Sequence, residues 1–333
     1  MNPEPRGILA AIGNTPLVEL EKIIPGFPGR IFAKLEKFNP GGSIKDRPAL
    51  TMLHHKIVSG ELQPGRSVVI ESSSGNLAIG IAQICKYYGL RFICVVDAKT
   101  TGQNIALLRA YGATIEQVTD RDPETGEYLP VRIRRVRELV EQTPHGYWPN
   151  QYANLLNARA HERTVKEIID ALDGRVDYLF CATSSFGTLR GCADHIRARG
   201  LPTKVIAVDA VGSAIFDGQC PAPRIIPGHG SSVRPPLMDP GAATEVVHVT
   251  DLECIVACRQ LMERESILVG GSSGATISAL TRTGPRIPDG ATCVAIFPDG
   301  GERYLDTIFS DAWILAHFGE VTHLWKSSSD GRI

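Results

Sequence analysis

Arg66-Ser-Val-Val-Ile-Glu-Ser-Ser-Ser-Gly-Asn76 joins a run of apolar, β-branched residues directly to a turn of serines and glycine. The run at residues 66–70 predicts a strand buried on both faces, and the turn at residues 71–76 predicts a junction between that strand and a helix. In a parallel sheet such junctions lie at the carboxyl ends of the strands, where ligands bind. The stretch therefore predicts an α/β fold with a ligand site at this edge of its sheet.

The same alternation of strand and helix patterns extends along the whole chain. Further strands are predicted at residues 92–96, 114–118, 178–182, 205–209, 245–249 and 293–297. Between them lie segments of helical period, among them residues 48–58, with Asp46 suited to the helix start and Gly60 to its end. The fold class predicted is α/β, with mainly parallel sheets and helices on their faces. The glycines and prolines of residues 218–240 predict a surface excursion.

Composition narrows the class of ligand. The chain has 333 residues, of which 43% are hydrophobic, enough for one large core or two moderate ones. Its 35 Lys and Arg balance 36 Asp and Glu, a formal net charge of −1, which disfavours a surface for nucleic acid or an anionic membrane. A small neutral or zwitterionic ligand fits better. No apolar run reaches the ~20 residues of a membrane span and no signal-peptide pattern is present, so we expect a cytoplasmic protein.

The cysteines do not predict a metal site. All eight are scattered through apolar runs, without the C-x-x-C pair or Cys/His cluster that zinc requires. We expect buried free thiols and no bound metal.

Two more turns resemble the first in composition, Thr183-Ser-Ser-Phe-Gly-Thr188 and Gly270-Gly-Ser-Ser-Gly274. Each is predicted to join a strand to a helix, and the free amides of a helix N-terminus bind anions. Three such turns predict two anions, for instance a carboxylate and a phosphate. Neither a P-loop nor a dinucleotide fingerprint is present. The turn Gly270–Gly274 matches the G-x-S-x-G motif of serine hydrolases, but a loop made only of Gly and Ser produces that match easily, so serine hydrolysis is disfavoured.

Lys45 has an unusual setting. Asn39-Pro-Gly-Gly-Ser-Ile-Lys-Asp-Arg-Pro48 places it in a Gly-rich turn just ahead of a predicted helix. Amide dipoles and desolvation can leave such an amine neutral and nucleophilic, as Schiff-base chemistry with an aldehyde cofactor requires. A solvated loop lysine is the alternative, and the residues alone leave both open.

Taken together, the motifs resemble those of the fold type II pyridoxal-phosphate enzymes, the group of cysteine synthase and the tryptophan synthase β-chain. The resemblance rests on the stretch from Lys34 to Arg47, on Ser73-Ser-Gly-Asn76, on the two later turns and on Pro298-Asp-Gly-Gly-Glu-Arg303. It implies a two-domain protein that binds pyridoxal 5′-phosphate and forms a homodimer. Residues 46–156 would form a smaller, mobile domain that binds the substrate carboxylate. Residues 1–45 and 157–333 would form the larger, cofactor-binding domain.

The resemblance also implies a role for each site residue. Lys45 would be the Schiff-base lysine, Asn76 would hydrogen-bond the cofactor's 3′ oxygen, and Ser272 would be the hydroxyl partner of the pyridine nitrogen. The substrate's α-carboxylate would be held by Ser73, Ser74 and Gly75. The cofactor phosphate would be held by Ser184, Ser185, Phe186, Gly187 and Thr188. Phe186 departs from the pattern, because many relatives carry a small residue there, and we expect it to contribute only its backbone N–H and to point its ring elsewhere.

A neutral hydroxyl at the pyridine nitrogen favours β-elimination, through an aminoacrylate that a second substrate attacks. Leu77 replaces the threonine of cysteine synthases, and segments such as Ile226-Pro-Gly-His-Gly-Ser-Ser232 resemble the branch that makes N-(2-amino-2-carboxyethyl)-L-glutamate for 2,3-diaminopropionate and siderophore pathways. That branch implies O-phospho-L-serine as donor and L-glutamate as nucleophile. Arg132, Tyr152 and Ser185 would bind the donor phosphate.

Three alternatives stay open at this stage. They are a cysteine synthase that uses sulfide with O-acetylserine or O-phosphoserine, a serine or threonine dehydratase, and a non-catalytic binding or regulatory protein of the same fold. The residues that bind the acceptor glutamate are not evident from the sequence, with Arg234 in the Gly/Pro-rich excursion as the one weak candidate.

Overall fold

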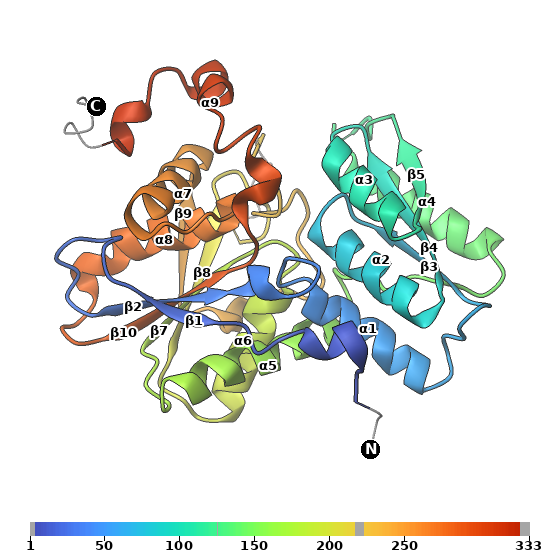
Figure 1. The fold of residues 1–333 in the computed structure, drawn as a ribbon, viewed down its shortest axis with the longest axis horizontal. Helices are drawn as coiled ribbons and strands as arrows, with labels where there is room; N and C mark the ends of the chain where they lie inside the picture. Colours follow the sequence, from blue (N-terminus) through green and yellow to red (C-terminus); the bar gives the residue numbers. More distant parts are fainter. Residues whose placement is uncertain (1–3, 125, 217–222, 327–333) are drawn as a thin grey trace.

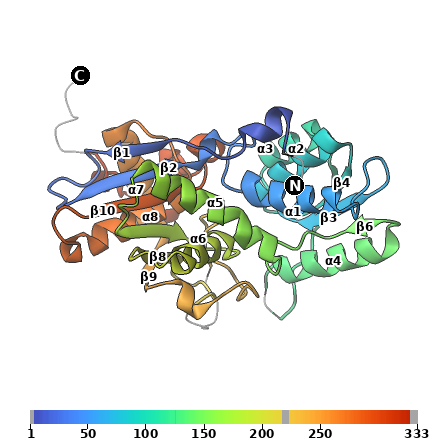
Figure 2. The same ribbon diagram turned by 90° about the horizontal axis from the view of Figure 1, so that it is seen from below.

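A computed structural model describes residues 4–124, 126–216 and 223–326. The chain forms two parallel-sheet lobes, each with helices on both faces of its sheet (Figure 1). Seen from below, the green helices α5 and α6 run along one face of the larger lobe, and α4 lies along the underside of the smaller one (Figure 2). The described residues include no helix that is both long and apolar enough to cross a membrane.

The larger lobe is built on a six-stranded sheet. Only its edge strand β1 is antiparallel, to β2. The strand order is β1 (Leu17–Leu20), β2 (Arg30–Leu35), β10 (Thr292–Phe297), β7 (Tyr178–Ala182), β8 (Lys204–Ala210) and β9 (Glu245–Val249). One face packs on α7 (Asp251–Glu265) and α8 (Gly271–Thr283), and the other packs on α5 (Leu155–Ala171) and α6 (Gly187–Ala198). Because helices cover both faces, the central strands are apolar on both, as the sequence predicts.

The smaller lobe is built on a four-stranded parallel sheet, in the order β5 (Thr114–Val118), β4 (Arg91–Asp97), β3 (Val68–Ser72) and β6 (Gly146–Tyr147). Helices α1 (Asp46–Val58), α2 (Asn76–Tyr88) and α3 (Gly102–Ala110) share one apolar core with it, and α4 (Leu129–Gln142) packs on the other face. Leu9 of the 3-10 turn Gly7–Ala11 is fully buried in the first of these cores, although it lies outside residues 46–156.

The remaining elements are short. Helix α9 (Asp311–Phe318) follows the last strand. The other described 3-10 turns are Glu36–Phe38, Pro240–Ala242, Gly284–Arg286, Gly301–Tyr304 and Thr322–Leu324.

All seven predicted strands form, and those at 114–118, 178–182 and 245–249 have the predicted bounds. The prediction that the turn at Gly270 follows a strand is wrong. Val269 makes only an isolated bridge to Gly300, because the chain reaches α8 from α7 on the same face of the sheet. Strands β1, β2 and β6 were not predicted. In the excursion at 218–240, residues 223–240 form loop and one 3-10 turn, and residues 217–222 lie outside the described part.

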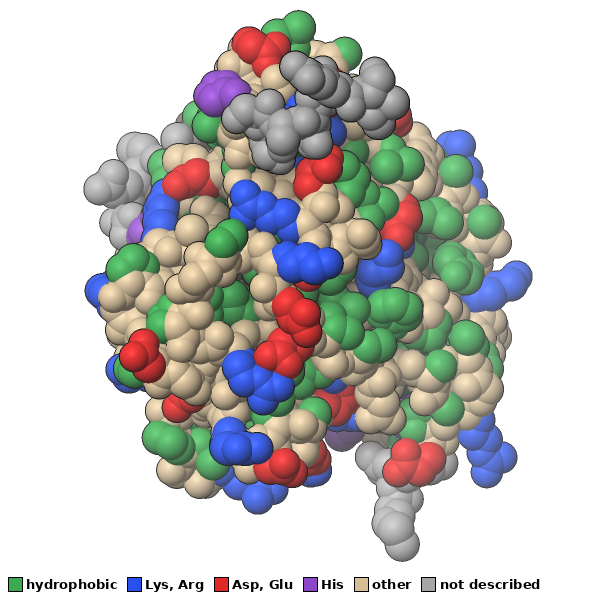
Figure 3. All heavy atoms as spheres, turned by 60° about the vertical axis from the view of Figure 1, so that its left-hand side comes forward, with side chains coloured by type: hydrophobic (Ala, Val, Ile, Leu, Met, Phe, Trp, Pro, Cys, Tyr) green, Lys and Arg blue, Asp and Glu red, His purple; other side chains and the backbone are tan. Residues whose placement is uncertain are grey.

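The distribution of surface charges and the burial of the cysteines agree with what the composition predicts. On the face drawn in Figure 3, Lys and Arg side chains are interspersed with Asp and Glu, with no large patch of one sign. All seven described cysteines are free and buried, and Cys220 lies outside the described residues.

Candidate active site

Lys45 stands directly before α1, in the turn that follows β2. Its backbone N–H donates to Ser43 Oγ over 3.2 Å, and Ser43 forms an isolated bridge with Asp299, just after β10. Burial lowers the pKa of Lys45 to about 8, although the charge of Asp299 raises it. The lysine is therefore held between two parallel strands at their carboxyl ends, with an amine that loses its proton more easily than a surface lysine.

Asp299 connects the two lobes at this point. Its Oδ2 accepts hydrogen bonds from Asn76 Nδ2, at 2.7 Å, and from the Tyr304 hydroxyl, at 2.6 Å. Burial raises the pKa of Asp299, and these two hydrogen bonds oppose the rise. The N–H of Gly270 donates to the Asp299 carbonyl over 3.3 Å, so the N-terminus of α8 lies beside the same residue. Lys45, Asn76 and the start of α8 thus meet at one buried carboxyl group.

Asn76 begins α2 and makes a second contact across the lobes. Its Oδ1 accepts from Arg303 Nη1, and Arg303 Nη2 donates to the carbonyl of Gly41 over 2.7 Å. Both polar atoms of the amide are engaged here, so a bond from Asn76 to a cofactor oxygen, as predicted, requires exchange or sharing of one of these partners.

The predicted carboxylate loop forms the start of α2. Ser73 Oγ accepts from the N–H groups of Gly75, at 3.4 Å, and Ala78, at 3.2 Å. The Ser74 carbonyl accepts from Asn104 Nδ2 over 3.0 Å. Ser74 and Gly75 are half-buried, and a Cβ built on Gly75 would meet nothing within 4 Å. The loop therefore has free space beside its glycine.

The predicted phosphate loop lies at the N-terminus of α6, which is pressed closely against α5. A Cβ on Gly187 would lie 2.2 Å from Asn157 Oδ1, and one on Gly191 would lie 1.9 Å from the Ala158 carbonyl. Asn157 Nδ2 donates to Ser185 Oγ over 3.3 Å. The first turn of α6 carries no acidic residue, so its free amides can receive an anion.

Thr188 is supported by a histidine that sequence reasoning missed. His161 Nε2 lies 3.4 Å from Thr188 Oγ1, and its Nδ1 lies 3.3 Å from Thr164 Oγ1. Burial lowers the pKa of His161 well below its usual range, and the charge of Lys45 lowers it further. The ring is therefore neutral and orients the threonine hydroxyl of the loop.

Phe186 adopts a left-handed backbone, with φ 71°. For a bulky side chain this conformation costs about 1 kcal/mol or more. The ring is buried and packs against Phe216, with 5.7 Å between the ring centroids. Burial in the core of the larger lobe offsets the cost.

Ser272 lies in the first turn of α8 and is nearly buried. A Cβ on Gly270, which precedes this turn, would lie 2.1 Å from Asp299 Oδ1. Ser273, the next residue, is fully buried, and its Oγ has no hydrogen-bond partner in the described structure. The α8 N-terminus thus carries two serines shortly after Gly270, which itself packs against Asp299.

Arg132 lies in α4, and Tyr152 lies in the turn before α5. Arg132 Nη1 is 3.3 Å from Asp97 Oδ2, but its buried Nε and Nη1 have no hydrogen-bond partner among the described residues. Burial raises the pKa of Tyr152, and the charge of Arg132 opposes the rise. Glu71, at the end of β3, accepts from Trp148 Nε1 at 2.9 Å, and burial raises its pKa to about 7. A cation with an N–H free of hydrogen bonds to described residues therefore lies near a half-buried phenol.

A buried ionic network fixes the start of α1. Arg47 donates to Glu36 Oε2 at 2.7 Å and to Glu167 Oε1 at 2.8 Å, and Lys34 Nζ lies 2.8 Å from Glu167 Oε2. Burial alone would raise the pKa of Glu167, but hydrogen bonding and charge from Arg47, together with Lys34, lower it to about 2. The network ties β2, α1 and α5 together beneath Lys45.

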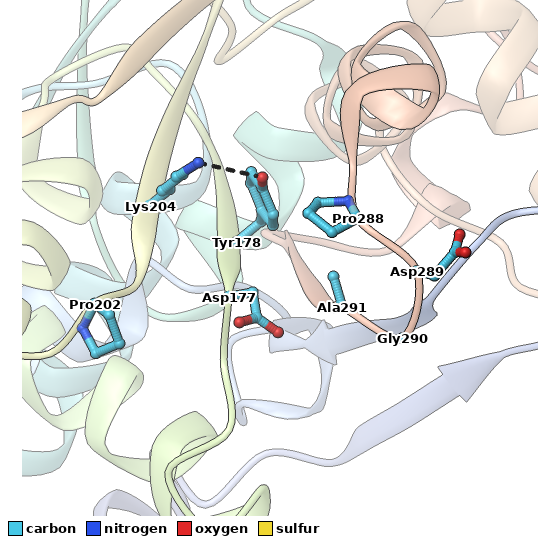
Figure 4. Close-up of a pocket in the computed structure, with 8 residues that line it drawn as sticks. All are labelled: Asp177, Tyr178, Pro202, Lys204, Pro288, Asp289, Gly290 and Ala291. Carbon is cyan, nitrogen blue, oxygen red and sulfur yellow. Dashed lines mark hydrogen bonds between the residues drawn. The ribbon is translucent and has the colours of Figure 1, made fainter.

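A separate hollow lies at the amino ends of the strands, far from these residues in the sheet. Figure 4 shows Tyr178 at the start of β7 and Lys204 at the start of β8, joined by a 3.4 Å hydrogen bond, beside Pro288 and Ala291. Ligands of parallel sheets bind at the carboxyl ends. The hollow is therefore not the candidate active site.

Sequence reasoning also missed Asp299, Arg303 and Asn157 as members of the site. For Asp299 a signal was present, because Pro298-Asp-Gly-Gly follows a predicted strand, as the turns at residues 71–76 and 183–188 do. Asn157 and His161 lie inside a regular helix, where spacing gives no sign that they face the next helix.

The arrangement fits pyridoxal phosphate. It offers an amine of lowered pKa to an aldehyde and a helix N-terminus to a phosphate. Among the buried polar atoms without a partner in the described structure, Asn157 Oδ1, Ser273 Oγ and Asp299 Oδ1 belong to these turns and their neighbours and are available to a bound polar group.

Comparison with known proteins agrees with the geometry. Residues 8–299 match the family model described as pyridoxal-phosphate dependent enzyme. The chain is 44% identical over 310 residues to an N-(2-amino-2-carboxyethyl)-L-glutamate synthase of Ralstonia nicotianae, covering 93% of this chain and 91% of that protein. It is also 44% identical to a protein of the same name from Cupriavidus metallidurans, covering 92% and 90%. The crystal structure of O-ureido-L-serine synthase superposes with a TM-score of 0.85 at 30% identity, covering 94% of this chain and 100% of that one. The chain belongs to the family of pyridoxal-phosphate-dependent enzymes, with the fold of their cysteine synthase-like members.

Proposed function

We propose that this enzyme joins O-phospho-L-serine to L-glutamate by β-replacement, forming N-(2-amino-2-carboxyethyl)-L-glutamate and releasing phosphate. The observation that carries the proposal is half-buried Arg132, which lies near Tyr152 and whose buried Nε has no hydrogen-bond partner among the described residues, in a chain 44% identical to relatives of that name. A phosphate leaving group needs such a receptor, whereas the acetyl group of O-acetylserine does not. The product would supply 2,3-diaminopropionate for siderophore or related natural-product biosynthesis.

Pyridoxal phosphate, when bound, supplies an electron sink that makes the Cα proton of an amino acid acidic. We propose that it is held by Lys45, Asn76, Ser184, Ser185, Phe186, Gly187, Thr188 and Ser272. Phe186 would contribute its backbone N–H alone, since its ring is buried in the core.

Binding and proton transfer follow from the loops. The N–H groups and hydroxyls of Ser73, Ser74 and Gly75 would bind the donor's α-carboxylate at the N-terminus of α2. Lys45, with a pKa of about 8, is suited to accept the Cα proton and later to return it. Its return completes the new amino acid.

Departure of phosphate requires compensation of its charge. Arg132 would donate its unpartnered N–H groups, and the hydroxyls of Tyr152 and Ser185 would add hydrogen bonds. The α-amine of glutamate must be unprotonated to add at Cβ, so the acceptor is expected to react better as pH rises toward its own pKa.

Water must be excluded while Cβ is electrophilic. We propose that residues 46–156 act as a mobile domain that closes over the donor against residues 1–45 and 157–333. The open space beside Gly75 supports this movement. The proposal includes a homodimer in the cytoplasm. The exposed Ile8 and Tyr87, on either side of Gly7, offer apolar surface to a second copy, and buried free thiols suit a reducing compartment.

The test is to incubate the holoenzyme with O-phospho-L-serine, with and without L-glutamate, and to measure phosphate and product mass. Glutamate-dependent phosphate release with a condensed product is the expected result. Consumption of sulfide with O-acetylserine instead would indicate a cysteine synthase, and pyruvate without any acceptor would indicate a dehydratase. Absence of a coenzyme absorption band would indicate a binding protein.

A further inference from the structure

The segment from Arg224 to Ser231 lies over the carboxyl ends of β7 and β8. The N–H of Gly230 donates to the carbonyl of Thr183 over 2.8 Å, directly before the phosphate loop. At its other end, the segment contacts α8, since a Cβ on Gly271 would lie 2.4 Å from Ile226 Cγ2. The segment therefore spans the two helix N-termini that carry the predicted cofactor residues.

Arg224 has no acidic partner among the residues the structure describes. Among the described residues, its Nη1 donates only to the carbonyl of His229, at 3.4 Å, and its buried Nε has no partner there. The guanidinium lies against Gly230, where a Cβ would come within 2.7 Å of Nη1. A buried guanidinium N–H without a carboxylate is costly unless a ligand provides one.

His229 is a second unsatisfied group in the same segment. It is 2% exposed, and neither ring nitrogen has a partner in the described part of the chain. Burial, together with the charge of Arg224, lowers its pKa to about 3, so the ring is neutral and can donate one hydrogen bond.

The position of Arg224 relates it to the donor site without making it part of that site. The charge of Arg224 lowers the pKa of Tyr152, as the charge of Arg132 does, so both arginines lie near that phenol. Arg132 comes from α4 of the smaller lobe, and Arg224 comes from the larger lobe. One cationic receptor serves the donor phosphate in the proposed function, and the acceptor brings two further carboxylates.

We infer that Arg224, assisted by His229, binds a carboxylate of the acceptor amino acid and so selects a dicarboxylic nucleophile. The inference rests on the proposed function. It gives the acceptor a site that is separate from the donor's phosphate receptor and that stays on the larger lobe when the smaller one moves.

The experiment compares Arg224→Gln with Arg234→Gln as its control. The sequence offered Arg234 as a candidate for the acceptor, but the structure leaves this arginine exposed, and its one hydrogen bond to a described group is to Met238 Sδ. In the Arg224 variant we expect the KM for L-glutamate to rise at least tenfold. The single-turnover release of phosphate from O-phospho-L-serine alone should stay within twofold of wild type. Calorimetric binding of glutarate, a non-reactive dicarboxylate, should weaken to the same extent. Arg234→Gln should change none of these values.

Two results would overturn the inference. An unchanged glutamate KM with unchanged glutarate binding would remove Arg224 from the acceptor site, and a raised KM for O-phospho-L-serine alone would assign it to the donor phosphate. If the wild-type enzyme releases no phosphate with glutamate, the proposed function fails first, and that failure is visible before any variant is made. Arg224→Lys keeps the charge and should recover part of the glutamate affinity, which a folding defect would not explain.

Discussion

The helix N-termini of α6 and α2 both face the active site, but they are packed very differently. At α6, a Cβ on Gly187 or Gly191 would overlap α5, at 2.2 Å and 1.9 Å from its nearest atoms. At α2, a Cβ on Gly75 would meet nothing within 4 Å, and Ser74 beside it is half-buried. The end proposed to hold a resident cofactor is fixed by close packing, whereas the end proposed to hold each passing substrate has room to move.

Lys45 lies between these two regions, and its replacement should have the largest effect. Lys45→Ala removes the only group placed to carry the Cα proton in the proposed mechanism, so we expect kcat to fall by about 10³-fold or more. The packing of neither helix N-terminus depends on this side chain, so the thermal midpoint should change by only a few degrees. Steady-state phosphate release measures the loss in kcat, and calorimetry measures the change in thermal midpoint. Residual activity within tenfold of wild type would contradict the assigned role.

Two buried glutamates, one near each of the two regions, also differ in their charge state. Glu167, beneath the fixed region, is held ionised by Arg47 and Lys34. Glu167→Gln should cost about 3 kcal/mol at pH 7, because it leaves buried cations incompletely compensated. Glu71, beside the open region, has a pKa of about 7, so Glu71→Gln should cost below about 1 kcal/mol at that pH. Urea unfolding of the two variants at pH 7 measures both losses in unfolding free energy.

The contributions of Glu167 and Glu71 to the unfolding free energy should depend on pH with opposite sign. The folded pKa of Glu167 lies near 2, below its ordinary value of 4.5, so its contribution is present above pH 4.5 and is lost as pH falls toward 2. The folded pKa of Glu71 is raised to about 7, so its contribution is present below pH 4.5 and is lost as pH rises through 7. Glu71→Gln should therefore gain stability relative to wild type between pH 5 and 8. A constant difference across that range would refute the raised pKa.

Replacement of Arg132 tests the proposed binding of the donor phosphate, without a change at the cofactor loops. Arg132→Gln should lower kcat/KM for O-phospho-L-serine by about 10²-fold, the effect of losing a charge-assisted bond to phosphate. The matched control is Arg134→Gln on the same helix, an exposed residue paired with Asp122 at 2.9 Å, which should stay within twofold. Equal losses in both variants would indicate damage to α4 and not loss of a receptor.

The same contrast explains what the sequence could and could not predict. The seven strands and the three Gly/Ser turns follow from local pattern, because buried parallel strands are apolar on both faces and turns need small residues. β1 and β2 lack that signal, since the antiparallel edge strand β1 is only partly buried and Lys34 lies within β2. The ionic network of Lys34, Arg47 and Glu167 joins residues more than 100 positions apart, which no local spacing reveals. Glycine letters alone also do not distinguish the packed Gly187 from the open Gly75.

That last distinction yields the smallest predicted effect and the most direct test of the comparison. Gly187→Ala must displace Asn157 or α6, so we expect a loss of about 1 to 3 kcal/mol in unfolding free energy and a weaker hold on the cofactor. In Gly75→Ala the new Cβ would meet no atom within 4 Å, so its loss should stay below about 1 kcal/mol. Chemical unfolding gives the two energies, and titration of the apoenzyme with pyridoxal phosphate gives the two affinities. If Gly75→Ala proved as destabilising as Gly187→Ala, α2 would be as tightly constrained as α6, and closure of the smaller domain over the substrate would lose its structural basis.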